Sequence, residues 1–136
     1  MFDEKKLHRI PIQMRFGDLD GLNHVNNANH LTYFELGRIA FFREVLNGFD
    51  SNEVQFVVKY TEIDFKAPLH FEDHPEIVSW ISETGKTHCV FSHEVRDTKS
   101  DVVYSTGKIV LVWIDSTLKK VPIPDNVKDL LQKSMP

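Results

Sequence analysis

Apolar side chains recur at helical spacing in the first third of the chain. Leu31, Phe34, Phe41 and Val45 follow one another at intervals of three, seven and four residues, which places them on one face of a helix. The segment 28–46 that contains them has no proline and a single glycine. The pattern therefore predicts one long helix over residues 28–46.

Polar residues mark both ends of this predicted helix. Asn26 and Asn27 precede it, and asparagine is a favoured N-cap because its side-chain oxygen accepts a hydrogen bond from a free N–H of the first turn. Asn47 and Gly48 follow it, and glycine often ends a helix because it adopts a positive φ at little cost. We expect the helix to begin near residue 27 and to end near residue 46.

The rest of the chain has the patterns of strands. Ile10, Ile12 and Met14 alternate with polar residues, which predicts a half-buried strand over residues 8–15. Further segments with alternating, β-branched or aromatic residues cover 54–65, 77–83, 88–97 and 102–115. A short helix that carries Val127, Leu130 and Leu131 follows them.

The order of these elements predicts the fold class. One strand and the long helix are followed by four strands, and short turns such as 84–87 join successive strands. Sequential strands joined by short turns pair in antiparallel fashion. We therefore predict an α+β fold in which a single helix packs on, and is largely enclosed by, an antiparallel sheet.

Composition limits the size and the class of the protein. The 136 residues are 41% hydrophobic and 26% charged, with no linker-like stretch, which predicts one globular domain over residues 1–136. A chain of this size buries roughly two-thirds of its surface, enough for one core. The net charge of −4 argues against a protein dedicated to nucleic acids, which normally has a basic surplus.

Hydropathy and cysteine usage favour a cytoplasmic location. The longest apolar run is Ile109–Ile114, far shorter than the roughly 20 residues of a membrane-spanning helix. The charged first residues lack the apolar stretch of a signal peptide. Cys89 is the only cysteine, so no internal disulfide can form.

Three motif-like features do not carry the chemistry that they first suggest. Gly85-Lys86-Thr87 lacks the second glycine and the following helix of a phosphate-binding loop. His70 and His74 have the spacing of metal ligands but lie in a segment that resembles a loop, and no metal site is expected. Cys89 lies within an apolar strand pattern, which favours a small buried side chain over a nucleophile.

The polar segment before the long helix is the best candidate for chemistry. A carboxylate at Asp20 would lie near the positive end of the helix dipole, which favours its ionised form. The first turn of the helix, near Asn27 and Ala28, exposes N–H groups that can stabilise a developing oxyanion. The segment could therefore form an acyl-transfer site, although its asparagines and aspartates also suit turns and caps.

The same segment resembles a known family. The stretch FGDLDGLNHVNNANHLTYFELGR, residues 16–38, is similar to the signature of hotdog-fold acyl-CoA thioesterases of the 4-hydroxybenzoyl-CoA thioesterase type. The order of the downstream elements also fits, so the resemblance covers roughly residues 8–123. It implies a hotdog fold, a curved antiparallel sheet wrapped around one long central helix, and hydrolysis of acyl-CoA to a free acid and CoA.

The resemblance also implies roles for single residues. Asp20 matches the catalytic carboxylate, which acts as a general base on water or as a nucleophile on the thioester carbonyl. Asn27 matches the residue whose backbone N–H binds the thioester oxygen. His24 and Asn26, which lie between them, would shape the pocket or orient the carboxylate or water, unless they only form the turn and cap. Asp18 would hold the loop rather than take part in chemistry.

The resemblance further implies partners and no cofactor. The activated thioester needs neither a metal nor a cofactor, and CoA phosphates would contact basic residues among Lys66, Lys86 and Arg96. An acyl carrier protein could replace CoA as the carrier. In this family two subunits complete each site, so a homodimer is expected, and pairing of dimers into a homotetramer is common.

Departures from the family pattern leave the reaction class intact. His30 stands where tyrosine is common, so it could change the pocket wall and the preferred acyl chain, and Gly37 stands where alanine is usual. Two alternatives remain open. One is a hotdog hydratase or dehydratase, whose Asp and His are five residues apart, whereas Asp20 and His24 are four apart. The other is a non-catalytic module that binds acyl thioesters.

Overall fold

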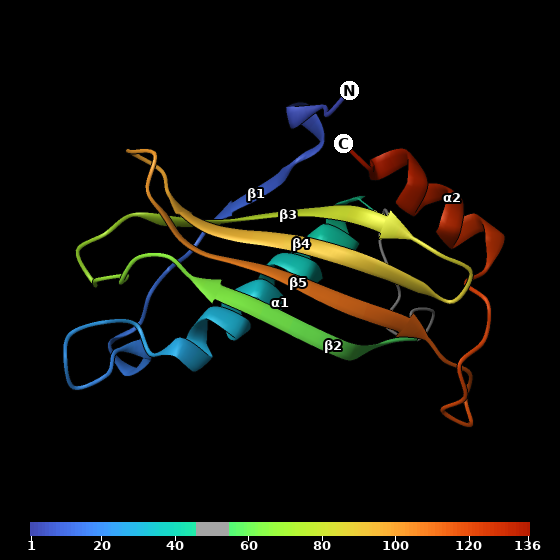
Figure 1. Ribbon diagram of the computed structural model, residues 1–136, viewed down its shortest axis with the longest axis horizontal. Coiled ribbons are helices and arrows are strands. Elements are labelled where there is room, and N and C mark those ends of the chain that lie inside the picture. Colours follow the sequence, from blue (N-terminus) through green and yellow to red (C-terminus); the bar gives the residue numbers. More distant parts are fainter. Residues whose placement is uncertain (46–54) are drawn as a thin grey trace.

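The computed structural model describes residues 1–45 and 55–136, and the strands in these ranges form one antiparallel sheet (Figure 1). The strand order across the sheet is β1-β3-β4-β5-β2. The strands are β1 (His8–Pro11), β2 (Phe56–Phe65), β3 (Pro75–Thr84), β4 (His88–Asp97) and β5 (Val103–Trp113). The α-helices are α1 (Asn27–Val45) and α2 (Asp125–Ser134), and short 3-10 turns cover Glu4–Lys6 and Phe16–Asp18.

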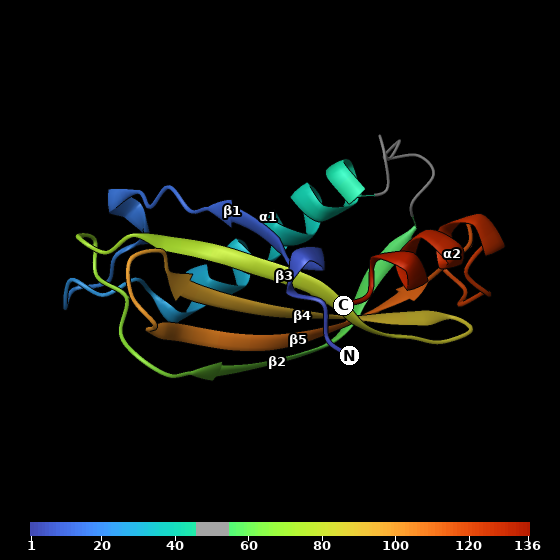
Figure 2. The same cartoon turned by 90° about the horizontal axis from the view of Figure 1, so that it is seen from above.

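The long helix α1 lies across one face of the sheet, as Figure 2 shows. It begins at Asn27, one residue before the predicted start, and Val45 is its last described residue. The predicted stop at Asn47 and Gly48 lies outside the described residues. The prediction of one helix packed on an antiparallel sheet is therefore confirmed.

The first strand is shorter than predicted. The prediction covered residues 8–15, but β1 ends at Pro11, which has no N–H to continue the ladder with β3. One further bond, from Ile12 N–H to the Pro75 carbonyl, closes the pairing where β3 begins. Beyond it the apolar alternation persists without a strand, because Ile12 and Met14 still pack against the core.

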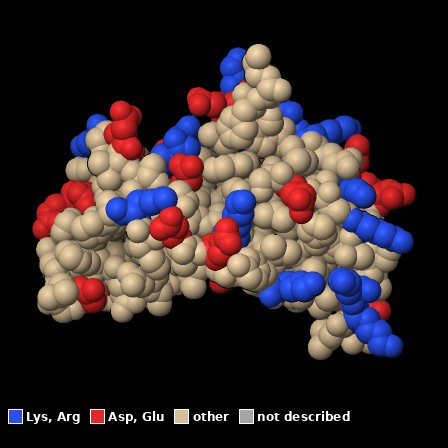
Figure 3. Space-filling view, viewed as in Figure 1, with Lys and Arg blue, Asp and Glu red and all other residues tan. Residues whose placement is uncertain are grey.

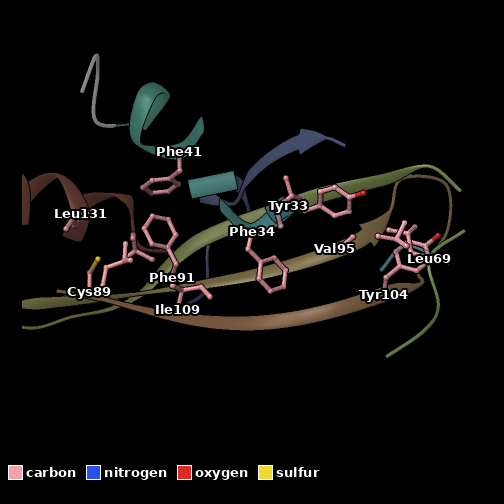
Figure 4. Close-up of a cluster of buried hydrophobic side chains, with 14 residues drawn as sticks. Tyr33, Phe34, Phe41, Leu69, Cys89, Phe91, Val95, Tyr104, Ile109 and Leu131 are labelled. Carbon is pink, nitrogen blue, oxygen red and sulfur yellow. The ribbon is translucent and has the colours of Figure 1, made fainter. Parts of the chain in front are cut away.

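The core lies between α1 and the concave face of the sheet, where aromatic rings meet (Figure 4). Phe34 and Phe41 of α1 are fully buried, and Phe41 meets Phe91 of β4 edge to face with ring centroids 5.0 Å apart. The ring of Phe34 occupies the space where a Cβ at Gly107 of β5 would lie. The sheet can therefore approach the helix closely at this glycine.

A second glycine brings the helix itself close to the sheet. A Cβ built at Gly37 of α1 would lie 2.5 Å from Ser79 Oγ and 2.8 Å from Ile77 Cγ1, both on β3. Ser79 Oγ also lies 2.8 Å from Nδ1 of His93, a histidine that is 1% exposed and stacks on Phe34. This close contact explains why glycine, not alanine, stands at position 37.

The terminal helix α2 covers the part of the sheet near β3. Leu131 is fully buried as its apolar pattern predicts, Val127 packs against the core, and Leu130 is 38% exposed. Neither α1 nor α2, nor any other helix within residues 1–45 and 55–136, is long and apolar enough to cross a membrane.

The outer face of the sheet carries many polar and charged side chains. Trp80, Ser92, Lys108 and Glu62 lie opposite one another on four neighbouring strands, and charges of both signs are interspersed over this face (Figure 3). The edge strand β2 and the helix α1 carry exposed apolar side chains as well. These are Val57, Val58 and Phe65 of β2 and Leu31, Leu36 and Ile39 of α1.

Candidate active site

Two loops meet at one end of the sheet, where α1 begins and β2 ends (Figure 1). The loop before α1 is joined to the segment after β2 by a hydrogen bond from Val25 N–H to the Leu69 carbonyl (2.8 Å). A bridge between His24 and His70 continues this contact, and the two rings meet edge to face with centroids 4.8 Å apart. The candidate segment is therefore held against β2 rather than projecting freely into solvent.

Asp18 holds this loop from inside. Its carboxylate is 2% exposed and accepts hydrogen bonds from the Tyr33 hydroxyl (2.8 Å), from Arg15 N–H (3.1 Å) and from the Arg15 guanidinium (3.2 Å). Burial raises the pKa of Asp18, but these hydrogen bonds and the positive charge outweigh burial and leave the pKa below its usual value. An ionised carboxylate thus ties the loop to α1, in agreement with the loop-holding role expected for it.

The carboxylate of Asp20 is exposed, and in the described part of the chain only one of its two oxygens accepts hydrogen bonds. Its Oδ1 accepts hydrogen bonds from Leu22 N–H (2.8 Å) and His24 N–H (3.2 Å). No residue in the described part of the chain hydrogen-bonds Oδ2. The pKa of Asp20 is lowered, first by the Leu22 N–H bond, with further contributions from the N–H and the charge of His24. The expected ionised form is thus favoured by the loop's own N–H groups.

The start of α1 leaves one backbone donor free. Asn26 is the N-cap, because its Oδ1 accepts a hydrogen bond from Ala28 N–H (2.9 Å), and its carbonyl accepts one from Asn29 N–H. The cap thereby uses the Ala28 donor. The N–H of Asn27 has no hydrogen-bond partner within residues 1–45 and 55–136, so it is the donor that remains available at the positive end of the helix.

Asp20 and Asn27 line the same cavity, which has a volume of about 270 Å³. Its other walls come from the loop and from the segment after β2. The lining residues are Asp20, His24, Val25, Asn27, His30, Phe65, Lys66, Ala67, Pro68 and Leu69. Larger hollows of about 340 and 360 Å³ lie over the outer face of the sheet, but neither is lined by Asp20 or Asn27.

Three of the four predicted site residues line this cavity. Asp20, His24 and Asn27 do so, whereas Asn26 caps the helix and is not among the lining residues. Lys66 is also part of the wall and forms an ion pair with Asp64 (2.7 Å). The cavity thus combines a free carboxylate oxygen, a free N–H donor and a basic side chain.

The other two basic residues considered for CoA phosphates lie away from the cavity. Lys86 belongs to the turn between β3 and β4, at the opposite end of the sheet. Arg96 lies on β4 and pairs with Glu94 (3.4 Å). Only Lys66 of the three is placed to contact a ligand in the cavity of the same chain.

The features that suggested a metal or a reactive thiol do not form such sites here. Within the described ranges, no group of three or more His, Cys, Asp or Glu side chains is arranged to hold a metal ion. Cys89 is fully buried under α1, and burial raises the pKa of its thiol to about 12. The predicted burial of the Cys89 side chain is confirmed.

Comparison with known proteins places this geometry in a family. The family model described as the thioesterase-like superfamily matches residues 14–131. The chain belongs to the thioesterase-like superfamily. The match includes both loops that form the cavity, and membership confirms the predicted resemblance and the enzyme class, a thioester hydrolase.

Individual relatives of this superfamily agree in length and fold. YbgC of Escherichia coli O157:H7, an acyl-CoA thioester hydrolase, is 22% identical over 112 residues, which cover 80% of this chain and 83% of YbgC. A thioesterase from Thermus thermophilus, solved in complex with coenzyme A and Zn, is 29% identical with a TM-score of 0.84, and the match covers 95% of this chain and 94% of that one.

A more distant structure shares the fold alone. The 1,4-dihydroxy-2-naphthoyl-CoA thioesterase of Synechocystis is 18% identical with a TM-score of 0.82, over 93% of this chain and 96% of its own. Together with the sheet order, these likenesses confirm the predicted α+β hotdog fold. At the level of the superfamily, the activity is that of an acyl-CoA thioesterase.

Sequence reasoning missed the far wall of the cavity. Phe65 and Leu69 come from the end of β2 and the segment after it, and no local pattern connects them with Asp20. His30, by contrast, was expected to affect the pocket wall, and it is 3% exposed and lines the cavity. Its spacing of three residues from Asn27 gives the physical reason, because such residues share a helix face.

Proposed function

We propose that this protein hydrolyses acyl-CoA thioesters in the cavity lined by Asp20 and Asn27. The proposal rests on two groups that line the same cavity. Asp20 Oδ2 accepts no hydrogen bond from the described residues, and Asn27 N–H has no partner among them. Oxyanion donors of this kind stabilise the charge that develops on a carbonyl oxygen during acyl transfer. The family membership and the CoA bound by the Thermus relative support CoA as the carrier.

The proposed reaction uses each group once. The thioester oxygen accepts a hydrogen bond from Asn27 N–H, which polarises the carbonyl carbon. Asp20 Oδ2 takes a proton from a water molecule that attacks this carbon, or Oδ2 attacks the carbon itself and water then hydrolyses the resulting anhydride. The C–S bond breaks, the thiolate takes up a proton, and the free acid leaves. His24 N–H keeps Oδ1 in place during either route.

No metal or cofactor takes part in the proposed reaction. A thioester is already activated toward attack, and the helix start supplies the electrophilic assistance. Lys66 is the basic side chain on the cavity wall and would pair with a phosphate of CoA. An acyl carrier protein offers the same pantetheine thioester, so both carriers belong in the substrate panel.

We also propose that two chains form the active unit. β2 is a ten-residue edge strand, and the N–H and C=O groups of its alternate residues point away from β5 and pair with no other described strand; Val58 of this strand is 51% exposed. Ile39 of α1 is exposed and lines the same hollow as Val58, so it adds apolar surface beside this strand. Pairing of two β2 edges would cover this surface and close the open side of the cavity, where Phe65 ends β2. Pairs of such dimers would form the expected tetramer.

Replacement of Asp20 tests the catalytic assignment. Asp20→Asn retains an oxygen for the Leu22 and His24 N–H groups but removes the charge, so thiol release from a panel of acyl-CoAs should fall by at least about 100-fold. The matched control is Asp101→Asn, which changes an exposed aspartate in the turn between β4 and β5 and should leave the rate unchanged.

The same assay separates the alternatives. Unchanged turnover in Asp20→Asn would remove Asp20 from the mechanism. Hydration of an enoyl-CoA without thiol release would favour the hotdog hydratase, and binding of acyl-CoA without turnover would favour the non-catalytic module.

A further inference from the structure

The histidine on the cavity wall is an unusual residue for an apolar acyl pocket. His30 of α1 is 3% exposed, and its ring meets the Phe65 ring edge to face with centroids 5.2 Å apart. Its Nδ1 lies 2.7 Å from Oγ of Ser105 on β5, a side chain that is fully buried. Ser105 of β5 and Phe65 of β2 therefore hold the ring in one orientation.

The other ring nitrogen of His30 has no partner. No residue in the described part of the chain hydrogen-bonds Nε2. Within the described residues, His8 Nδ1 and His93 Nε2 are fully buried without a hydrogen-bond partner, whereas His30 Nε2 is not fully buried. Since His30 lines the cavity, this nitrogen is reached from the cavity side. Because it faces the cavity and has no partner among the described residues, Nε2 can form a hydrogen bond with a ligand group.

The position of His30 indicates which part of a substrate it meets. His30 lies three residues after Asn27, which is one turn further along the same face of α1 and about 4.5 Å along the helix axis. An acyl group whose carbonyl oxygen binds Asn27 N–H would extend past the carbonyl toward His30. The first carbons beyond the carbonyl are then the ones nearest to Nε2.

We propose that His30 Nε2 hydrogen-bonds a hydroxyl group on the third carbon of the acyl chain, so that the site selects 3-hydroxyacyl thioesters over unsubstituted ones. This inference rests on the proposed function. A hydroxyl both donates and accepts, so it pairs with either tautomer of the imidazole. Burial lowers the pKa of His30 to about 4, and the ring is therefore neutral at physiological pH and suited to a neutral hydroxyl rather than a carboxylate.

Matched substrates test the selection in the unaltered protein. Thiol release is measured with hexanoyl-CoA and with the (R) and (S) forms of 3-hydroxyhexanoyl-CoA. One hydroxylated form should have a kcat/KM at least about tenfold higher than hexanoyl-CoA, the factor that one added hydrogen bond supplies. Equal values for all three substrates would overturn the inference but leave the proposed hydrolysis standing, whereas no thiol release from any substrate would overturn both.

Variants assign the selection to His30. The double replacement His30→Leu/Ser105→Ala removes both partners of the buried pair, so neither is left unsatisfied, and should bring the ratio of the two kcat/KM values to about one. His30→Gln keeps a polar nitrogen or oxygen near Nε2 and should retain part of the preference. A ratio unchanged in the double variant, or lost equally in His30→Gln, would contradict the assignment.

A second buried Ser–His pair provides the control. Ser79→Ala removes the hydroxyl beside His93, a pair that has the same chemistry but does not line the cavity. It perturbs the core without touching the substrate, so the ratio should stay at the unaltered value. Near-UV circular dichroism establishes that each variant is folded. Should the double variant fail to fold, the substrate ratio of the unaltered protein and His30→Gln still decide.

Discussion

A single buried carboxylate stabilises the loop that carries the proposed base. Asp18 Oδ2 accepts hydrogen bonds from both the Tyr33 hydroxyl and the Arg15 N–H, so its removal leaves the buried Tyr33 hydroxyl and the part-buried Arg15 N–H without these bonds. Asp18→Ala should therefore lower the free energy of unfolding by about 3 kcal/mol, measured by urea denaturation. Tyr33→Phe deletes one hydrogen bond only and should cost about 1 kcal/mol. A loss below about 0.5 kcal/mol in Asp18→Ala would contradict the role assigned to this carboxylate.

The proposed role of Asp20 predicts how the rate depends on pH. Hydrogen bonds from Leu22 and His24 lower its pKa below the usual 3.8, so the charged form persists to more acid pH. An activity that needs this charge is present above the lowered pKa and is lost as the pH falls through it. We expect kcat/KM to fall only below pH 3.8 on account of Asp20, as measured by chromatography of released CoA.

Two observations keep this pH profile interpretable. Far-UV circular dichroism at each pH separates loss of catalysis from acid unfolding. A fall in kcat/KM centred near pH 6 that disappears in Asp20→Asn would mean that the carboxylate has a raised pKa, contrary to its hydrogen bonds.

The sequence predicts the catalytic segment but not the cavity around it. Asp20, His24 and Asn27 lie within eight residues, so a local turn followed by a helix start is enough to bring them together. Phe65 and Lys66 reach the same cavity through the pairing of β2 with β5, a contact that depends on the tertiary fold. For Asn26 the sequence left open a role in the pocket or as the helix cap, and its side chain caps the helix.

Strand bounds were predicted best where apolar and polar residues alternate and a recognisable turn follows. The bounds of β4 agree with the prediction, and those of β3 and β5 agree to within two residues. The strand at 8–15 was overextended because alternation reports burial, and burial continues past Pro11 after the ladder has ended. Leu31 follows the helical period but is 40% exposed, since no element in the described part of the chain covers its side of α1.

The close contact between α1 and β3 depends on the absence of a side chain at Gly37. Alanine is a better helix former than glycine by about 1 kcal/mol, so Gly37→Ala would stabilise an isolated helix. Here the new Cβ would lie 2.5 Å from Ser79 Oγ, and helix and sheet would have to separate. We expect Gly37→Ala to lower the free energy of unfolding by about 1–3 kcal/mol in urea denaturation.

Another glycine provides the matched comparison for this substitution. Gly17 lies in the short turn before α1, with nothing within 4 Å of its added Cβ, so Gly17→Ala should change stability by no more than about 0.5 kcal/mol. Stabilisation of the protein by Gly37→Ala would show that the close contact can relax at no cost, and the steric argument would then be wrong.

At the scale of the whole molecule, activity should depend on assembly. Val58 lies on the edge strand β2 and is 51% exposed, in the surface that a second chain would cover. Val58→Asp places a charge there, so the dimer should dissociate and the rate should fall by at least about tenfold. Light scattering after size exclusion and the thiol-release assay measure the two effects on the same sample.

A substitution on the other side of the molecule controls for the added charge. Leu130 is an exposed leucine on α2, which packs near β3 and far across the sheet from β2, and Leu130→Asp should leave both mass and rate unchanged. A monomeric Val58→Asp variant with full activity would show that one chain forms a complete site.

The two edges of the sheet also differ in their tendency toward aggregation. β1 is protected, because it has only four residues, ends in a proline and carries the Arg9–Glu76 ion pair at its side. β2 is ten residues long, and although it has the Asp64–Lys66 ion pair and a register shift between Val58 and Tyr60, the side chains of Val58 and Tyr60 are both exposed. A newly made chain would thus expose a template for cross-β stacking unless a second chain covers this strand. Rapid association after synthesis would then protect the chain as well as complete its site.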